Sequence, residues 1–115
     1  MPSVLLVEDH APMRATLRMW LADVAEPIAE CDNGLEVCAS YAAHHPDFVL
    51  MDIELPGQDG IAATRALLLQ DPAARVLIVT GYDDVELRAA AQAAGARGYI
   101  LKENLAEARQ WLTAQ

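Results

Sequence analysis

The feature that most constrains this chain is a regular alternation of short apolar runs with longer stretches of helical periodicity. Uniformly apolar runs lie at Val4–Val7, Phe48–Met51 and residues 76–79. Short runs without polar residues are typical of strands buried on both faces, as in a parallel sheet. The amphipathic stretches between them predict repeated βαβ units, and therefore an α/β fold with helices on both faces of the sheet.

The remaining elements follow from the same spacing. The run 27–31 is polar and carries a proline, so we expect it at an edge of the sheet. The last strand is expected at Gly98–Leu101, and helices are expected at residues 12–23, 34–44, 61–70 and 105–113. A further helix should begin at Asp83 or Asp84 and end at Gly95, where glycine suits a left-handed C-cap.

The first helix indicates which of its faces is buried. Met13, Leu17 and Leu21 recur at helical spacing and should pack on the sheet. Arg14 and Arg18 fall on the other face of this helix, so we expect both side chains to point into water.

Size and charge limit the number of domains and the class of partner. The chain has 115 residues, which predicts one domain over residues 1–115. The net charge of −9 argues against direct nucleic-acid binding, which needs a basic surface, and suits a protein that binds a cation or a basic partner. Cys31 and Cys38 have neither CxxC nor zinc-site spacing, so we expect two reduced thiols.

No targeting or membrane-spanning segment is expected. Met1, Pro2 and Ser3 lead directly into a short apolar run, which does not resemble a signal peptide. The apolar runs are far too short to cross a bilayer. We therefore expect a soluble, cytoplasmic protein without a membrane partner.

Polar residues directly follow the apolar strands: Glu8 and Asp9 the first, Asp52 the third, Thr80 the fourth and Lys102 the fifth. In an open α/β sheet, ligands bind beyond the carboxyl ends of the strands, where the strand order reverses. We expect a single doubly wound, flavodoxin-like (βα)5 domain with the parallel order 2-1-3-4-5, which places this reversal between strands one and three. That order gathers the carboxylates into one pocket and places the hydroxyl and the ammonium beside it.

The chemistry of this set points to phosphoryl transfer. Clustered carboxylates raise each other's pKa, and a hard divalent cation such as Mg²⁺, or alternatively Mn²⁺, relieves their repulsion. A lysine and a hydroxyl beside the cation can bind the other oxygens of a phosphoryl group, and a carboxylate can serve as the nucleophile. Taken singly, each residue could equally be a helix cap or a surface charge. Their joint placement at the strand ends favours a functional site.

Four segments carry a resemblance to a known family: VLLVED at residues 4–9, DIELPGQDG at 52–60, VTG at 79–81 and GYILK at 98–102. In order and spacing they resemble the response-regulator receiver domains of two-component signal transduction, the CheY-like superfamily. The resemblance covers essentially the whole chain.

The resemblance implies a phosphoacceptor and a metal site. Asp52 would accept a phosphoryl group from the phosphohistidine of a sensor histidine kinase or phosphotransfer domain, or from a small acyl phosphate. Glu8, Asp9 and Asp52 would hold the metal, and the main-chain carbonyl of Glu54 would complete the protein's ligands. Such a domain is a signalling module, not a turnover enzyme, and catalyses only its own phosphotransfer and autodephosphorylation.

The resemblance also implies a switch. Thr80 and Lys102 would contact the phosphoryl oxygens, and Thr80 and Tyr99 would act as the switch residues. Their movement would remodel the face made by helix four, strand five and helix five. That face would then bind a second copy, a partner or an output domain.

Several alternatives remain open at this stage. A phosphatase of the dehalogenase type also uses a strand-end Asp, but its motif requires an Asp at the position of Glu54. A flavodoxin-type FMN carrier would need a phosphate loop rich in Ser, Thr and Gly. A receiver that acts only as a docking module would not need the complete acid, Thr and Lys set. His10 could be a metal ligand or phosphohistidine, although its position favours a loop or cap residue.

Overall fold

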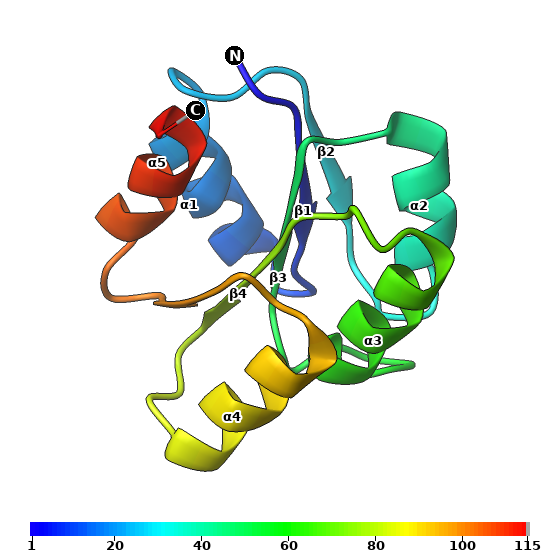
Figure 1. The fold of residues 1–115 in the computed structure, drawn as a ribbon. Helices are drawn as coiled ribbons and strands as arrows, with labels where there is room; N and C mark the ends of the chain where they lie inside the picture. Colours follow the sequence, from blue (N-terminus) through cyan, green and yellow to red (C-terminus); the bar gives the residue numbers. More distant parts are fainter. Residues whose placement is uncertain (115) are drawn as a thin grey trace.

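Strands and helices alternate along residues 1–114, the part of the chain that the computed structural model describes (Figure 1). The strands are β1 (Val4–Val7), β2 (Ile28–Cys31), β3 (Phe48–Met51), β4 (Val76–Thr80) and β5 (Gly98–Leu101). The helices are α1 (Ala11–Leu21), α2 (Val37–His44), α3 (Gly60–Gln70), α4 (Val85–Ala94) and α5 (Ala106–Thr113).

The strands form one parallel sheet in the order β2-β1-β3-β4-β5, which confirms the predicted fold class. The polar strand β2 lies at an edge, as its composition predicted. In the β1–β3 pair, Val7 lies opposite Met51 at the carboxyl end of both strands. The residues that follow, Glu8 and Asp52, therefore leave the sheet side by side, at the point where the strand order reverses.

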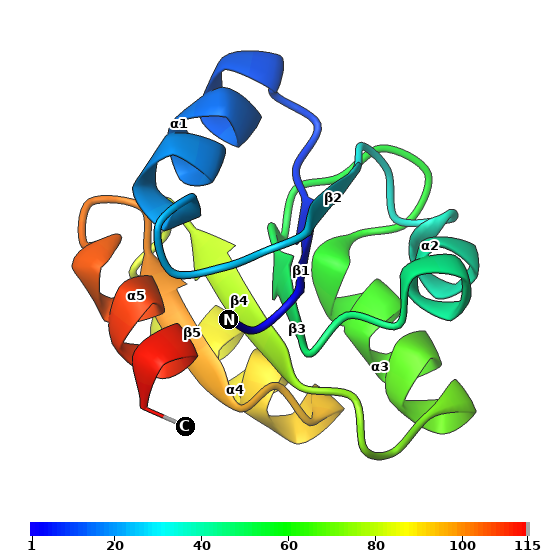
Figure 2. The ribbon, with the colours of Figure 1, turned by 90° about the horizontal axis from the view of Figure 1, so that it is seen from above.

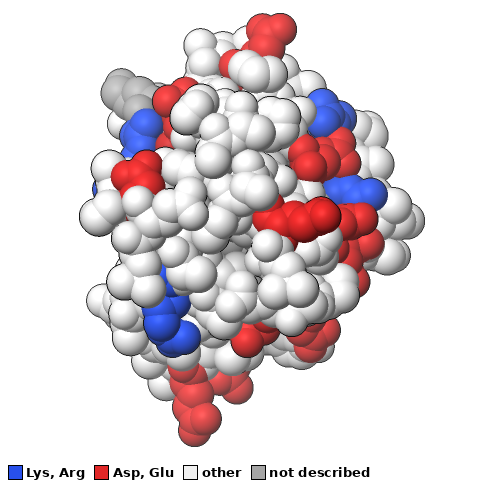
Figure 3. Space-filling model, turned by 90° about the vertical axis from the view of Figure 1, so that its right-hand side faces the viewer, with Lys and Arg blue, Asp and Glu red and all other residues white. Residues whose placement is uncertain are grey.

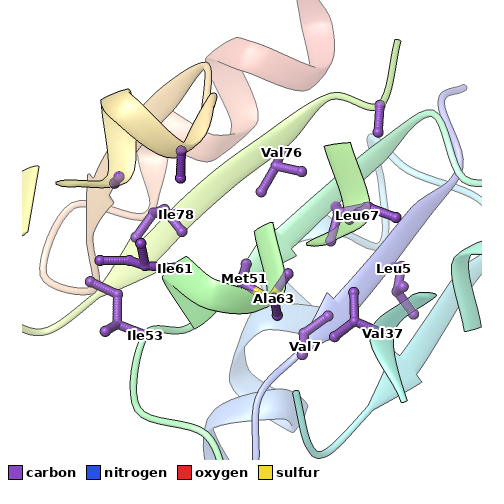
Figure 4. Packing of buried hydrophobic residues seen from close by; sticks show 14 of the residues in the cluster. Leu5, Val7, Val37, Met51, Ile53, Ile61, Ala63, Leu67, Val76 and Ile78 are labelled. Atoms are coloured by element: carbon purple, nitrogen blue, oxygen red, sulfur yellow. The ribbon is translucent and has the colours of Figure 1, made fainter. Parts of the chain in front are cut away.

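The sheet separates two apolar cores, because successive side chains of a strand point to opposite faces. Figure 2 shows α1 and α5 on one face and α2, α3 and α4 on the other. On the first face, Leu17 and Leu21 of α1 pack with Leu112 of α5 against the strands. On the second face, shown in Figure 4, residues such as Met51 and Leu67 pack together. Both faces of the inner strands are therefore buried from solvent, and polar side chains lie at the strand ends.

Two helix boundaries differ from the sequence prediction by more than one residue. The second helix was expected from Gly34, but α2 begins at Val37. Gly34 instead donates its N–H to the Pro56 carbonyl at 3.1 Å, and an added Cβ there would lie 1.7 Å from the carbonyl oxygen of Gln58. The loop after β2 thus packs against the loop after β3, and this contact keeps the backbone at Gly34 out of the helix. The first helix ends at Leu21, two residues earlier than expected at 23.

The predicted ends of α4 are confirmed. The Asp84 carboxylate accepts a hydrogen bond from the Leu87 N–H, which identifies Asp84 as the N-cap. Gly95 has a φ of 103° and forms the left-handed C-cap.

Surface and thiol chemistry agree with the composition. The face shown in Figure 3, on the side of α2 and α3, carries acidic side chains in several places, as expected for a chain with 17 Asp and Glu and 8 Lys and Arg. Cys31 and Cys38 are free cysteines. Among the helices of residues 1–114, none has the length and apolar character needed to cross a bilayer.

Candidate functional site

The structure brings together the acids that the sequence placed at the ends of β1 and β3. Oxygen atoms of Glu8, Asp9 and Asp52 all lie within 4.8 Å of one another. The Asp52 N–H donates to the Val7 carbonyl at 3.0 Å, and this bond continues the β1–β3 pairing one residue beyond the strands. Glu8 is 1 % exposed and Asp52 7 %, whereas Asp9 is exposed to solvent. The cluster therefore has a buried floor and an open side.

Lys102 joins this cluster from the end of β5. Its Nζ lies 2.7 Å from Glu8 Oε1 and 3.2 Å from Asp52 Oδ2. The Lys102 N–H donates to the Thr80 carbonyl at 2.8 Å, which ties the start of the side chain to the end of β4. One ammonium group thus bridges two buried carboxylates from different strands.

Burial and mutual repulsion separate the acidities of the two buried carboxylates. Burial and the negative charge of Glu8 raise the pKa of Asp52 to about 6, although Lys102 opposes the shift. Burial also disfavours the charged form of Glu8, but hydrogen bonds from Lys102 and from the His10 N–H hold the pKa of Glu8 below its usual value. At neutral pH both carboxylates are ionised, so the site combines concentrated negative charge with a single bridging ammonium.

This donor set fits a hard divalent cation. The converging atoms are carboxylate oxygens, and Mg²⁺ and Mn²⁺ prefer oxygen ligands. The raised pKa of Asp52 shows that its negative charge is poorly compensated, and a cation would stabilise the ionised form. Glu54 follows Asp52 by two residues in the loop after β3. Its main-chain carbonyl as a further ligand stays a prediction.

Thr80 lies beside the cluster, where its carbonyl accepts the Lys102 N–H, and it is linked to the more distant Tyr99 through Tyr82. The Tyr82 N–H donates to Oγ1 of the buried Thr80 at 3.3 Å. The Tyr99 hydroxyl donates to the Tyr82 carbonyl at 2.6 Å. The Tyr99 ring packs at the margin of the core beneath α4, with the Arg88 guanidinium 4.4 Å from its centroid. Thr80 ends β4, whereas the sequence placed it just after the strand.

Glu54, Tyr82, His10 and Arg14 surround the acidic cluster, and the sequence predicted the environment of some of these side chains better than that of others. Glu54 and Tyr82 lie close together, because a hydrogen bond to the Glu54 carboxylate raises the pKa of the Tyr82 hydroxyl. His10 is the N-cap position of α1 without a side-chain cap bond, which agrees with the loop interpretation. Arg14 contradicts its prediction: its side chain is 20 % exposed and donates to the Glu8 carbonyl at 2.8 Å instead of pointing into water. The helical spacing gave no signal for this contact.

Comparison with known proteins agrees with the motif analysis. Residues 4–112 match the model of the response regulator receiver domain. The chain belongs to the response-regulator receiver family. It is 40 % identical over 99 residues to the chemotaxis protein CheY of Halobacterium salinarum. The aligned residues cover 86 % of this chain and 82 % of that protein. It is thus a receiver domain of the two-component type, with a CheY-like fold.

Longer relatives contain the same domain. An uncharacterized transcriptional regulatory protein of Bacillus subtilis, YhcZ, is 35 % identical over 113 residues, which cover 93 % of this chain and 53 % of the relative. The chain spans about half the length of several such curated relatives. A crystal structure of a LuxR-family two-component response regulator from an Aurantimonas species superposes with a TM-score of 0.86 at 34 % identity, over 99 % of this chain and 86 % of that one.

Proposed function

We propose that this receiver domain, formed by residues 1–115, accepts a phosphoryl group on Asp52 in a Mg²⁺-dependent reaction. The donor is the phosphohistidine of a sensor histidine kinase or phosphotransfer domain, or a small acyl phosphate. One observation carries the proposal: the buried Asp52 carboxylate lies within 4.8 Å of Glu8 and Asp9 oxygens and contacts Lys102. The domain works in the cytoplasm as a signalling module whose own chemistry is limited to phosphotransfer and autodephosphorylation.

The residues divide the work of the transfer. An Asp52 oxygen attacks phosphorus, the new O–P bond forms, and the P–N bond of phosphohistidine breaks, so that the electron pair stays on the imidazole. The Ile53 N–H holds Asp52 Oδ1 at 2.8 Å, which fixes the orientation of the carboxylate before attack. Lys102, which contacts Oδ2 at 3.2 Å, balances negative charge on the phosphoryl oxygens. Thr80 donates its hydroxyl to another of these oxygens.

The cation site belongs to the same proposal. Glu8, Asp9 and Asp52, with the main-chain carbonyl of Glu54, would hold Mg²⁺, and Mn²⁺ could replace it. When bound, the cation supplies charge neutralisation for the transferring phosphoryl group. The exposed carboxylate of Asp9 lies on the open side of the cluster, from which the donor would approach.

Signal output would pass through the Thr80–Tyr82–Tyr99 chain. A phosphoryl group on Asp52 would draw the Thr80 hydroxyl toward itself as a donor, and this movement would weaken the bond that Thr80 Oγ1 accepts from the Tyr82 N–H in this structure. The Tyr82 carbonyl in turn holds the Tyr99 hydroxyl. We expect phosphorylation to turn Tyr99, which is half-buried here, further inward, and so to reshape the face of α4, β5 and α5. That face would bind a second copy or an output domain, without direct nucleic-acid or membrane contact.

Incubation with acetyl phosphate and Mg²⁺, followed by intact mass and site mapping, tests the chemistry. The protein should gain one phosphoryl group on Asp52, and the gain should be lost in EDTA. Asp52→Asn should not be modified, whereas Asp32→Asn, a change in an exposed aspartate of the β2–α2 loop, should behave as wild type. A phosphoryl group gained by Asp52→Asn at the wild-type rate would exclude Asp52 as the acceptor.

A further inference from the structure

The guanidinium of Arg14 joins α1 to two different strands. Its Nη1 donates to the main-chain oxygen of Glu8 at 2.8 Å, just beyond the end of β1. Its Nε donates to Glu30 Oε1 on the edge strand β2, also at 2.8 Å. Because the guanidinium is planar and carries its donors in a rigid fork, the two bonds hold the group in one orientation.

Glu30 anchors two arginines that lie one helical turn apart. Its Oε2 accepts a hydrogen bond from Arg18 Nε at 2.8 Å, while Oε1 accepts the bond from Arg14. Arg18 completes its contacts at the Ile28 carbonyl, in β2, at 2.8 Å. Both arginines therefore dock α1 on β2, but Arg14 also reaches the acidic cluster. This difference makes Arg18 a matched control for Arg14.

The Arg14 bond acts on the peptide that joins the first two acids of the cluster. The Glu8 carbonyl and the Asp9 N–H belong to one planar peptide group. On the other side of its Cα, the Glu8 N–H donates to the Cys31 carbonyl at 3.0 Å. With both neighbouring peptides tied, the backbone at Glu8 has one orientation, and that orientation turns the Asp9 carboxylate toward Asp52. A rotation of the Glu8–Asp9 peptide would separate these carboxylates.

We propose that Arg14, held by Glu30, is a positioning residue that orients the Glu8–Asp9 peptide for cation binding. The inference rests on the proposed function, because it presupposes that Glu8, Asp9 and Asp52 bind Mg²⁺. Mg²⁺ requires a nearly ideal arrangement of its ligands, so a small rotation at this peptide weakens binding. Loss of a group that orients a ligand lowers metal affinity by about 10–100-fold.

The test compares Mg²⁺ affinity in variants that remove the donors but keep an unbranched side chain. Isothermal titration of the whole chain with Mg²⁺ should show a Kd at least about tenfold higher for Arg14→Met than for wild type. Arg18→Met should stay within about twofold of wild type. Arg14→Lys, which keeps the charge but lacks the planar fork of donors, should give an intermediate Kd, and Glu30→Gln a smaller rise. At saturating Mg²⁺, Arg14→Met should accept a phosphoryl group from acetyl phosphate at close to the wild-type rate.

The outcomes separate the inference from the proposed function. Wild-type protein that neither binds Mg²⁺ nor is phosphorylated would refute the proposed function and the inference together. Wild-type binding with an unchanged Kd in Arg14→Met would refute the inference alone. Equal losses in Arg14→Met and Arg18→Met would also refute it, because docking of α1 would then be the cause. If circular dichroism shows that Arg14→Met is unfolded, Arg14→Lys takes its place, and a Kd no higher than that of Arg18→Met would then refute the inference.

Discussion

Replacing Asp52 by asparagine should stabilise the metal-free protein, because the ionised carboxylate destabilises the fold. Burial and the charge of Glu8 raise the pKa of Asp52 from 3.8 to about 6, against the attraction of Lys102. A carboxyl whose pKa is higher in the folded state binds its proton more tightly there. Folding stability therefore falls as the pH rises from the unfolded to the folded pKa, and the full penalty applies above the folded pKa.

The size of the effect follows from the two pKa values. At about 1.4 kcal/mol per pKa unit, the rise from 3.8 to about 6 corresponds to about 3 kcal/mol at a pH of about 7.5. At about pH 5.2, between the two values, the penalty is about 2 kcal/mol. Asparagine keeps the shape without the charge, but it binds Lys102 less well. We therefore expect its free energy of unfolding to exceed that of wild type by about 1–3 kcal/mol at about pH 7.5, and by less at the lower pH.

Urea unfolding in excess EDTA, followed by circular dichroism at both pH values, measures this gain. Asp9→Asn is the matched control, because Asp9 belongs to the same cluster but is exposed, and its substitution should change stability by less than about 0.5 kcal/mol. An Asp52→Asn protein no more stable than wild type near neutral pH would refute the reasoning, as would an equal gain in Asp9→Asn. Adding Mg²⁺ well above its Kd should stabilise wild type by about 1–3 kcal/mol and have little effect on either variant.

Three further predictions concern packing, lifetime and output. Gly60→Ala should lower the free energy of unfolding by about 1–3 kcal/mol, because its Cβ would lie 1.8 Å from the main-chain oxygen of Asp52. Gly81→Ala, with no atom within 4 Å of the added Cβ, should change the free energy of unfolding by less than about 0.5 kcal/mol in the same urea titration. If the domain is phosphorylated on Asp52 as proposed, Glu54→Ala and Tyr82→Ala should each speed autodephosphorylation, since the resemblance to receiver domains implies that both side chains flank the path of the attacking water; unchanged or slower decay of the phosphorylated protein in both variants would contradict this role. Tyr99→Phe loses the 2.6 Å bond to the Tyr82 carbonyl and should leave phosphorylation intact. It should reduce the change that beryllofluoride, used as a phosphoryl mimic, causes in the amide NMR signals of α4. A change as large as in wild type would argue against the switch.

The sequence by itself determined the layers of the fold and the floor of the site. Uniformly apolar runs such as Val4–Val7 can be stable only when both faces are covered, so they predicted the inner strands. Glu8 and Asp52 stood out because they directly follow such strands, and Lys102 because it directly follows the expected last strand. A parallel sheet brings its carboxyl ends to one edge, so chain order and strand order together predicted that these side chains would meet.

Only the tertiary structure decided which groups hold these residues in place. Arg14 looked like a surface residue, because its helical periodicity reports the face opposite the core and carries no information about the Glu8 carbonyl or Glu30. From the sequence, Gly34 was expected to begin a helix, but in the structure the loop at Gln58 packs against it. The Tyr82 main chain joins Thr80 to Tyr99 through bonds that no side-chain type encodes.

The physical reason lies in the range of the interactions. Hydrophobic period, helix caps and strand composition depend on residues close together in the chain, and a sequence displays them directly. Contacts such as that of Arg109 with the Trp20 carbonyl and Asp23 join residues more than 80 positions apart. They depend on the relative placement of whole helices and strands, which is settled only when the two apolar cores pack.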